Sequence, residues 1–464
     1  MTFRKQTSWL SGKQASPSRL VLASVATTLA VILNACSSSV TVPKSTASGP
    51  QLYMTPTIYE GAAGVTYTNS VATVSIDDAA LTFAQKTYSA QTGAQVNYSG
   101  ELVSPPLARG LKELELLYAC GATTGTCASI SPTNPPSSSG WAVELADQSG
   151  GLEQLTGQAF VPMVPAVTCP SMSIPESFLF VTLPEPLGDW NPTHTTAYGS
   201  VDISASGSTV TFASINQYNL AGSLIAPASS QTGVCSSTVF GNTIAIPGNI
   251  SSTTIPPAPT VVTPQAMVAI GPSGMLVEDS GGTSYLGAST GAIGLPKPSG
   301  TVDTSALVGA QYLGFFYGSG TTPASSPNWS SSVASFGFPS LPSTCPTLSN
   351  GTLSNPIYGG DFLNDNPGAL AVQAHSGYPV DNNGNYQCDL TIDLGPTQPT
   401  NGLFSSAKVY VGSGFAANKT GKSYSFSAVA IAGQLNGKYA IFLVGEDTTG
   451  TPNQAWGIYL LQSN

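Results

Sequence analysis

Charged side chains are scarce in this sequence, and histidine is scarcer still. Charged residues make up 8% of the 464 residues, against roughly 25% in ordinary soluble domains, and only 13 residues are Lys or Arg and 2 are His. The formal net charge is −10, so the basic surface that nucleic-acid binding requires is missing. Composition therefore argues against a nucleic-acid partner and leaves histidine-based catalysis few places to occur.

Long helical patterns are also missing after residue 50. The chain instead has 49 Gly and 36 Pro, with short alternating runs such as Val71–Ile76 and Gln95–Tyr98. We predict an all-β fold of tandem antiparallel barrel-like or sandwich units after a β-rich N-terminal region, with a β-propeller as the alternative. Leu111–Tyr118 fits a helix or a strand, and we favour a strand because it runs directly into a short loop between two cysteines.

The most specific stretch lies near the N-terminus. Basic residues without any acid precede an apolar run at 20–33, a pattern typical of a secretory signal and too short for a comfortable membrane span. The run ends in Leu33, Asn34, Ala35 and Cys36. This motif resembles the lipobox of bacterial lipoproteins, with Asn34 departing from the usual Ala or Ser. An ordinary secreted protein and a short uncleaved anchor are the alternatives.

The resemblance to bacterial lipoproteins has consequences for location. It implies cleavage before Cys36, a diacylglyceryl group on its sulfur and an acyl group such as palmitate on its amine. Two or more chains give stable membrane anchoring. Ser37, where Asp would favour retention in an inner membrane, favours the outer membrane. The overall character is similar to that of uncharacterised proteobacterial lipoprotein families, so the expected location is the cell envelope.

Composition and spacing suggest five segments. These are a signal peptide at 1–35, a Ser/Thr/Pro tether at 36–50, an N-terminal β-region at 51–140 and two β-units at 141–280 and 281–464.

The two β-units have features of an internal duplication. Each contains a Cys-Pro start, at Cys169 and Cys345, and each ends in an acidic pattern, at Val277–Asp279 and Val444–Asp447. A weaker third copy of the closing pattern lies at Val143–Asp147. The order of the matches differs between the copies, so chance resemblance among β-strands is the competing interpretation.

The remaining cysteines predict disulfides. An even number of them in an oxidising compartment indicates three bridges, and we favour sequential pairing. The pairs would be Cys120 with Cys127, Cys169 with Cys235, and Cys345 with Cys388. No CxxC pair occurs, so we expect no metal at these residues.

For each candidate catalytic or binding group, a structural interpretation is favoured over a functional one. His194 and His375 lie in polar loops, where solvated histidines are common. Glu278–Asp279 and Glu446–Asp447 could pair carboxylates, but adjacent strand residues point to opposite faces, so acidic turns are favoured. Asp381–Asn385 has alternating oxygen ligands, but it lacks the remaining EF-hand ligands and fits an Asn-Gly hairpin better. The sequence assigns no catalytic residue, metal site or cofactor.

The sequence therefore predicts a protein anchored to the membrane through Cys36, with a binding or scaffolding role and no catalysis. An envelope hydrolase or glycan-active enzyme is one alternative, with carboxylates that converge only in the folded chain. A carrier of a small apolar ligand is another. The ligand or protein partner is left open.

Overall fold

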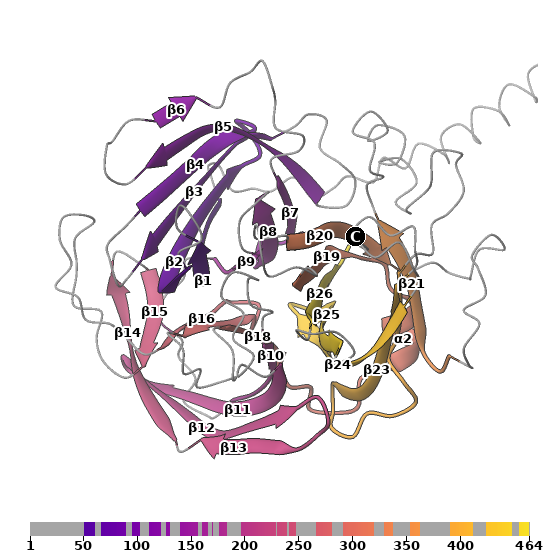
Figure 1. Cartoon of the computed structure of the whole chain (residues 1–464). Coiled ribbons are helices and arrows are strands. Elements are labelled where there is room, and N and C mark those ends of the chain that lie inside the picture. Colours follow the sequence, from indigo (N-terminus) through magenta and orange to yellow (C-terminus); the bar gives the residue numbers. More distant parts are fainter. Residues whose placement is uncertain are drawn as a thin grey trace, which may run out of the picture. The chain divides into compact units, whose positions relative to one another are not determined.

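A computed structural model gives the fold of most of the chain (Figure 1). The described residues are 51–60, 66–89, 95–102, 111–121, 127–129, 140–155, 160–165, 169, 176–182, 196–228, 230–238, 241–246, 266–280, 291–319, 329–336, 353–361, 390–411, 424–447 and 454–463. Residues 47–464 form one compact unit. Apart from one short helix, the regular elements described are strands, and the expectation of an all-β fold is confirmed.

The first sheet is a meander of antiparallel strands in the order β1-β2-β3-β4-β5-β7-β8-β9, with β6 paired to β5. Its strands are β1 Gln51–Glu60, β2 Thr66–Asp77, β3 Thr82–Ser89, β4 Gln95–Leu102, β5 Leu111–Gly121, β6 Cys127–Ser129, β7 Gly140–Glu144, β8 Gly151–Leu155 and β9 Phe160–Met163. An isolated bridge joins Tyr53 of β1 to Pro165, just beyond β9. The last strand thus returns to the first, but without a full ladder.

The second sheet closes on itself. Its strands are β10 Glu176–Thr182, β11 Ala197–Ser206, β12 Thr209–Asn219, β13 Leu224–Ala228, β14 Gln231–Thr238, β15 Gly241–Ile246, β16 Ala266–Ile270, β17 Leu276–Ser280 and β18 Gly291–Pro296. They follow the order β11-β10-β18-β17-β16-β15-β14-β12-β13, and β11 also pairs with β12. That extra ladder completes a ring of eight strands and leaves β13 attached outside it.

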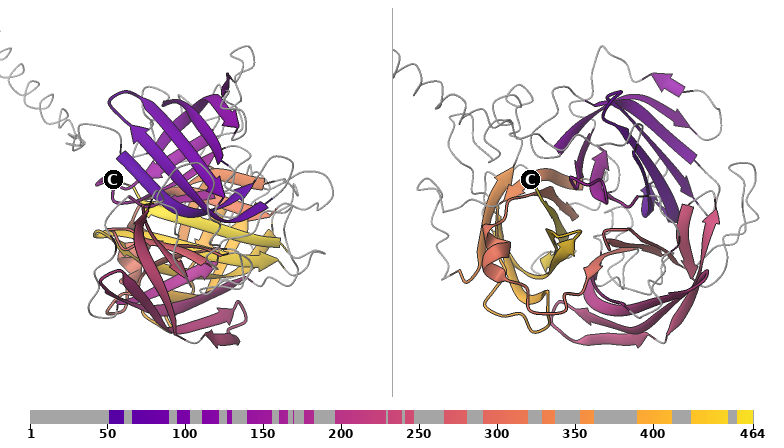
Figure 2. Two further views of the ribbon diagram at one scale, coloured as in Figure 1. Left: turned by 90° about the vertical axis from the view of Figure 1, so that its left-hand side faces the viewer. Right: turned by 180° about the vertical axis from the view of Figure 1, so that it is seen from behind.

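The third sheet is a closed barrel of the strands β19 to β26 in chain order, seen from behind in Figure 2. They are β19 Tyr312–Ser319, β20 Trp329–Phe336, β21 Pro356–Asp361, β22 Leu390–Asp393, β23 Leu403–Val411, β24 Tyr424–Leu435, β25 Lys438–Asp447 and β26 Gln454–Gln462. A continuous ladder from Tyr312↔Gln462 to Gly318↔Trp456 closes it. Gly314 is needed in that ladder, because an added Cβ would lie 1.8 Å from the Tyr459 carbonyl oxygen.

A short helix, α2 (Thr304–Gly309), precedes the barrel. Asp303 caps its start by accepting hydrogen bonds from the backbone N–H groups of Ser305 and Ala306. Leu307 packs into the apolar interior of the barrel, and the Tyr312 hydroxyl donates to the Leu307 carbonyl. The helix is therefore held by the barrel rather than by its own length.

Alternation along the barrel strands sends side chains into two different cores. On β25, Ile441 and Leu443 join the barrel's interior cluster, whereas Phe442 and Val444 join a cluster outside it. Both faces are buried, which explains the continuous apolar run of this strand. Each fully buried side chain of this size contributes about 1.5–3 kcal/mol of burial free energy.

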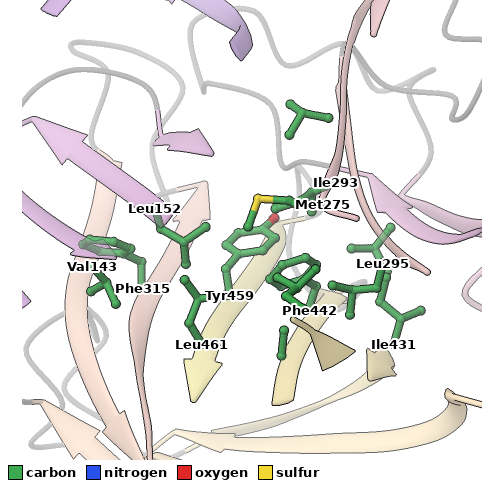
Figure 3. Close-up of a cluster of buried hydrophobic side chains, with 14 of the residues drawn as sticks. Val143, Leu152, Met275, Ile293, Leu295, Phe315, Ile431, Phe442, Tyr459 and Leu461 are labelled. Atoms are coloured by element: carbon green, nitrogen blue, oxygen red, sulfur yellow. The ribbon is translucent and has the colours of Figure 1, made fainter. Parts of the chain in front are cut away.

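The outer cluster contains buried residues from all three sheets (Figure 3). Val143 and Leu152 come from the first sheet, Ile293 from the second, and Phe315 and Tyr459 from the barrel. The described part of residues 47–464 therefore shares a core besides the interiors of its separate sheets.

The three sheets share one strand order, which sharpens the duplication hypothesis. In each, eight strands form an antiparallel meander whose last strand returns to the first. The similar sequences Phe178–Val181 and Tyr312–Phe316 lie on the first strands of the second ring and the barrel, β10 and β19. The closing patterns Val277–Asp279 and Val444–Asp447 lie on the seventh strands, β17 and β25. These two matches are in register with the topology. The weaker third copy of the closing pattern begins on β7, the sixth strand of the first meander, and the Cys-Pro starts at Cys169 and Cys345 come before β10 and after β20, so these matches are out of register.

The sheets divide the chain at different residues from the sequence segments. The first sheet continues beyond 140 to Met163, and the second continues beyond 280 to Pro296. The reason is that backbone hydrogen bonding defines a sheet, and a change in loop composition does not reveal it. The propeller alternative is wrong, because the described strands form eight-stranded meanders rather than four-stranded blades.

Candidate functional site

Several residues singled out in the sequence lie outside the described part of the chain. They are Leu33, Asn34, Ala35, Cys36, His194, His375, Cys345, Cys388 and the segment Asp381–Asn385. Lipidation of Cys36 and the pairing of Cys345 with Cys388 stay predictions.

The other cysteines are placed. Cys169 and Cys235 are joined by a disulfide with an S–S distance of 2.11 Å, the pairing that sequential order predicts. It fastens Cys169, seven residues before the start of β10, to β14 of the same ring. Cys120 and Cys127 are register partners on β5 and β6, and their disulfide stays a prediction.

The paired acids lie within strands rather than in the turns expected from the sequence. Glu278 is buried on β17, where it is flanked in the ladder by Val268 and Ala292. Glu446 lies on β25 opposite Ala455. Glu278 is paired on both sides and Glu446 on one side, and this pairing, which a single sequence does not reveal, places both acids within the sheets.

A different group of charged residues comes together at one end of the first sheet. Lys112 follows Leu111 at the start of β5, and alternation sends the two side chains to opposite faces. Leu111 joins the cluster shared by the three sheets, whereas Leu114 joins the interior cluster of the first sheet. Lys112 lies on the same face as Leu114, so its ammonium group is carried inside.

Two carboxylates meet that ammonium group. Lys112 Nζ contacts Asp78 Oδ1, in the turn after β2, and Glu144 Oε2, at the end of β7. The side chains of Lys112 and Glu144 are 10% and 4% exposed, whereas that of Asp78 is 49% exposed. The lysine is therefore covered on the inner side and opens toward solvent only past Asp78.

Tyr53 completes this cluster, which we call the Lys112 cluster: Tyr53, Asp78, Lys112 and Glu144. The Tyr53 hydroxyl donates to Glu144 Oε1. Burial, and next the negative charge of Glu144, raise the pKa of Tyr53 far above its ordinary value, so the hydroxyl stays protonated. The phenol thus fixes one oxygen of Glu144 and leaves the other for Lys112.

Glu153 is a second buried acid beside this cluster. It pairs in the ladder with Ala142 of β7, and Ala142 pairs in turn with Lys112, so the three form a row across the sheet. Glu153 is 0% exposed, and neither carboxylate oxygen has a hydrogen-bond partner. Burial raises its pKa to about 8. Glu153 is therefore a neutral acid at pH 7.

The arrangement combines an amine, two carboxylates, a phenol donor and a neutral carboxylic acid, all of them buried except the half-exposed Asp78. Such groups can exchange protons and can react with each other. Glu153 and Glu144 lie beneath the surface, out of reach of an external substrate. The chemistry available here is therefore internal to the chain.

The sequence contains a signal for this site. Leu114, Leu116 and Tyr118 alternate as a strand, and extending the alternation back by two residues places Lys112 on their apolar face. The same reasoning on Gly140–Glu144 places Glu144 beside Ala142. The meeting of these residues with Asp78 and Tyr53 depends on strands far apart in the sequence.

Among the described residues, no group of three or more His, Cys, Asp or Glu side chains could hold a metal ion. No helix found there has the length and apolar character needed to cross a membrane.

Comparison with known proteins gives distant structural similarity only. No protein-family profile matches the chain, and neither does any curated protein sequence. Among solved structures, transferrin-binding protein B of Haemophilus parasuis Hp5, a mutant of a vaccine antigen, is 9% identical with a TM-score of 0.24, covering 90% of this chain and 76% of that one. Isotype 1 transferrin-binding protein B from serogroup B Neisseria meningitidis is 10% identical with a TM-score of 0.24, covering 90% and 77%. At these scores neither similarity carries an argument about function.

Proposed function

We propose that this chain is a lipid-anchored protein of the cell envelope with a binding or scaffolding role and no catalytic activity. The lipobox-like motif at Leu33–Cys36 supports the anchor, and Ser37 supports the outer membrane. The oxidised Cys169–Cys235 pair agrees with a compartment outside the cytosol.

One observation carries the non-catalytic part of the proposal: the reactive groups that the fold gathers are buried. Glu144 and Glu153 are 7% and 0% exposed, and Lys112 contacts carboxylates of its own chain. An enzyme needs its acid or base within hydrogen-bonding reach of a substrate. These residues meet protein instead.

The interior of the barrel weighs against the alternative of a small-ligand carrier. Large apolar side chains from most of its strands fill it, including Phe316, Phe404 and Trp456. Eight strands enclose a space just wide enough for such side chains. We therefore expect binding to use the outer surface of the protein, and the ligand to be another protein or a component of the envelope.

The anchor is tested by labelling with a radioactive fatty acid and by membrane fractionation. We expect the wild-type chain to be labelled and to sediment with the outer membrane. Cys36→Ala should lose the label and accumulate as uncut precursor. Ser37→Asp should keep the label but move to the inner membrane. Unchanged labelling of Cys36→Ala would refute the anchor.

The binding role is tested by native electrophoresis of gently solubilised envelopes. We expect the lipidated chain to migrate as part of a larger assembly, and the soluble chain cut before Ser37 to recover that assembly from envelopes of a strain lacking the protein. Migration as a free monomer in both experiments would contradict the role.

A further inference from the structure

The Lys112 cluster places an amine against two carboxyl groups. A buried ammonium is costly to desolvate, and carboxylates repay that cost only with good geometry and further hydrogen bonds. Lys112 Nζ contacts one carboxylate from Asp78 and one from Glu144, and the second is held by the Tyr53 hydroxyl. The nitrogen therefore has one carboxyl group fixed beside it as a proton acceptor and another in position to react.

We propose that Lys112 and Asp78 become joined by an isopeptide bond within the chain, with Glu144 as the catalytic proton-transfer residue. Three features support this: an amine and a carboxyl group in direct contact, a neighbouring carboxyl group on the same nitrogen, and the burial of Lys112 and Glu144. The bond is a modification of the fold and goes beyond the proposed envelope role.

The reaction balances without any added reagent. Glu144 takes a proton from the Lys112 ammonium and passes it to the Asp78 carboxylate, giving a neutral amine and a carboxylic acid. The amine nitrogen attacks Cγ of Asp78, a tetrahedral intermediate forms, and the C–O bond breaks as Glu144 delivers a second proton from nitrogen to the leaving hydroxyl. The products are an amide and one water molecule, and Glu144 is regenerated.

Position favours this reaction over simple ion pairing. Holding the reacting groups in contact replaces a bimolecular encounter by an intramolecular one. Asp78 is half-exposed, so the water released has a short path to solvent.

The bond would add a covalent crosslink within the first sheet. It would link the β2–β3 turn to the start of β5 across a separation of 34 residues. These strands belong to the continuous part of the meander, whereas the sheet returns to its start through the single bridge Tyr53↔Pro165.

Mass spectrometry of the denatured, reduced protein tests the proposal directly. After subtraction of the lipid groups on Cys36, we expect the mass of the processed chain to be lower than its sequence mass by one water molecule. Protease digestion should yield a branched peptide that joins the segment containing Asp78 to the segment containing Lys112. A full sequence mass with unlinked peptides from both segments would overturn the proposal and leave an ion pair only.

Variants identify the roles of the residues. Lys112→Arg keeps the positive charge but cannot form the amide, so it should restore the full mass. Glu144→Gln should leave most of the chain unlinked while Lys112 and Asp78 are intact. Lys86→Arg, at an exposed lysine on β3, is the matched control and should keep the deficit of one water. A deficit that persists in Lys112→Arg would also overturn the assignment.

Discussion

The interiors of the first sheet and of the barrel are built by opposite means. The barrel interior is almost entirely apolar. Asp393 of β22 alternates with the interior residues Leu390 and Ile392, so it lies on the other face of the strand, where it accepts hydrogen bonds from the backbone N–H groups of Asn355 and Gly395. The first sheet has a smaller apolar cluster and buries Lys112, Glu144 and Glu153.

The difference follows the way each sheet closes. A complete ladder pairs the backbone N–H and C=O groups of β19 and β26, so the barrel interior can be filled with apolar side chains. The first sheet has one bridge at the same place, and Tyr53 of β1 reaches Glu144 of β7 by a side-chain hydrogen bond. In the first sheet, polar side chains therefore help to join the first and last strands, whereas backbone pairing alone joins them in the barrel.

Placing an acid in the barrel should have the largest effect. Leu443 is fully buried in the barrel interior, where the described residues offer a carboxylate no basic group. We expect Leu443→Glu to destabilise the chain by more than about 4 kcal/mol, and Leu443→Met by less than about 1.5 kcal/mol. Urea unfolding followed by tryptophan fluorescence measures both. If Leu443→Glu lowered the free energy of unfolding no more than Leu443→Met does, the barrel interior would tolerate a charged group as the first sheet does.

Glu153 should give an intermediate, pH-dependent effect. Its pKa is raised from an ordinary 4.5 to about 8 by burial, so the folded state binds the proton more tightly than the unfolded state. Stability should therefore fall as pH rises from 4.5 to 8, by up to about 1.4 kcal/mol per pH unit, and then level off. Glu153→Gln should remove this slope and be more stable than the wild type at pH 9.

Urea unfolding at pH 5, 7 and 9 checks this prediction, with Glu101→Gln on the exposed face of β4 as control. The control should keep the wild-type slope. The same slope in Glu153→Gln would mean that another group is responsible.

The smallest effect should come from the hydrogen bond between the two regions. Asn436 Nδ2, in the β24–β25 turn, donates to Asp147 Oδ2, in the β7–β8 turn. Burial raises the pKa of Asp147, but hydrogen bonds from Ser149 and Asn436 outweigh it and lower the pKa below 3.8. The resulting stabilisation is present above pH 3.8 and is lost as pH falls through the folded-state pKa.

Asp147→Ala should therefore cost about 1 kcal/mol or less at pH 7, because the site is exposed, and nothing at a pH below the folded-state pKa. Thermal unfolding at pH 7 and in acid measures it, with Ala146→Ser in the same turn as control. A loss of several kcal/mol would show that the first sheet and the barrel depend on each other more than this contact indicates.

The sequence predicted which segments form strands better than it predicted which strands pair with each other. Period-two alternation identified the strand character of Leu111–Tyr118, and the order of cysteines predicted Cys169–Cys235. It failed at the boundaries near 140 and 280, because hairpins of different sheets have similar turn residues. It also interpreted Glu278 as a turn residue, since the burial of a strand residue depends on both neighbouring strands.

By itself, the sequence determined the all-β class through its many glycines, prolines and short alternating runs, because such runs can bury an apolar face only in sheets. The leader predicts the location in the cell envelope through the motif at Leu33–Cys36, which can be recognised without the fold. Tertiary structure alone decided that Tyr53, Asp78, Lys112 and Glu144 meet. They come from strands and turns spread over almost 100 residues, and only the return of β7 beside β5, and of Pro165 to Tyr53 of β1, brings them within bonding distance.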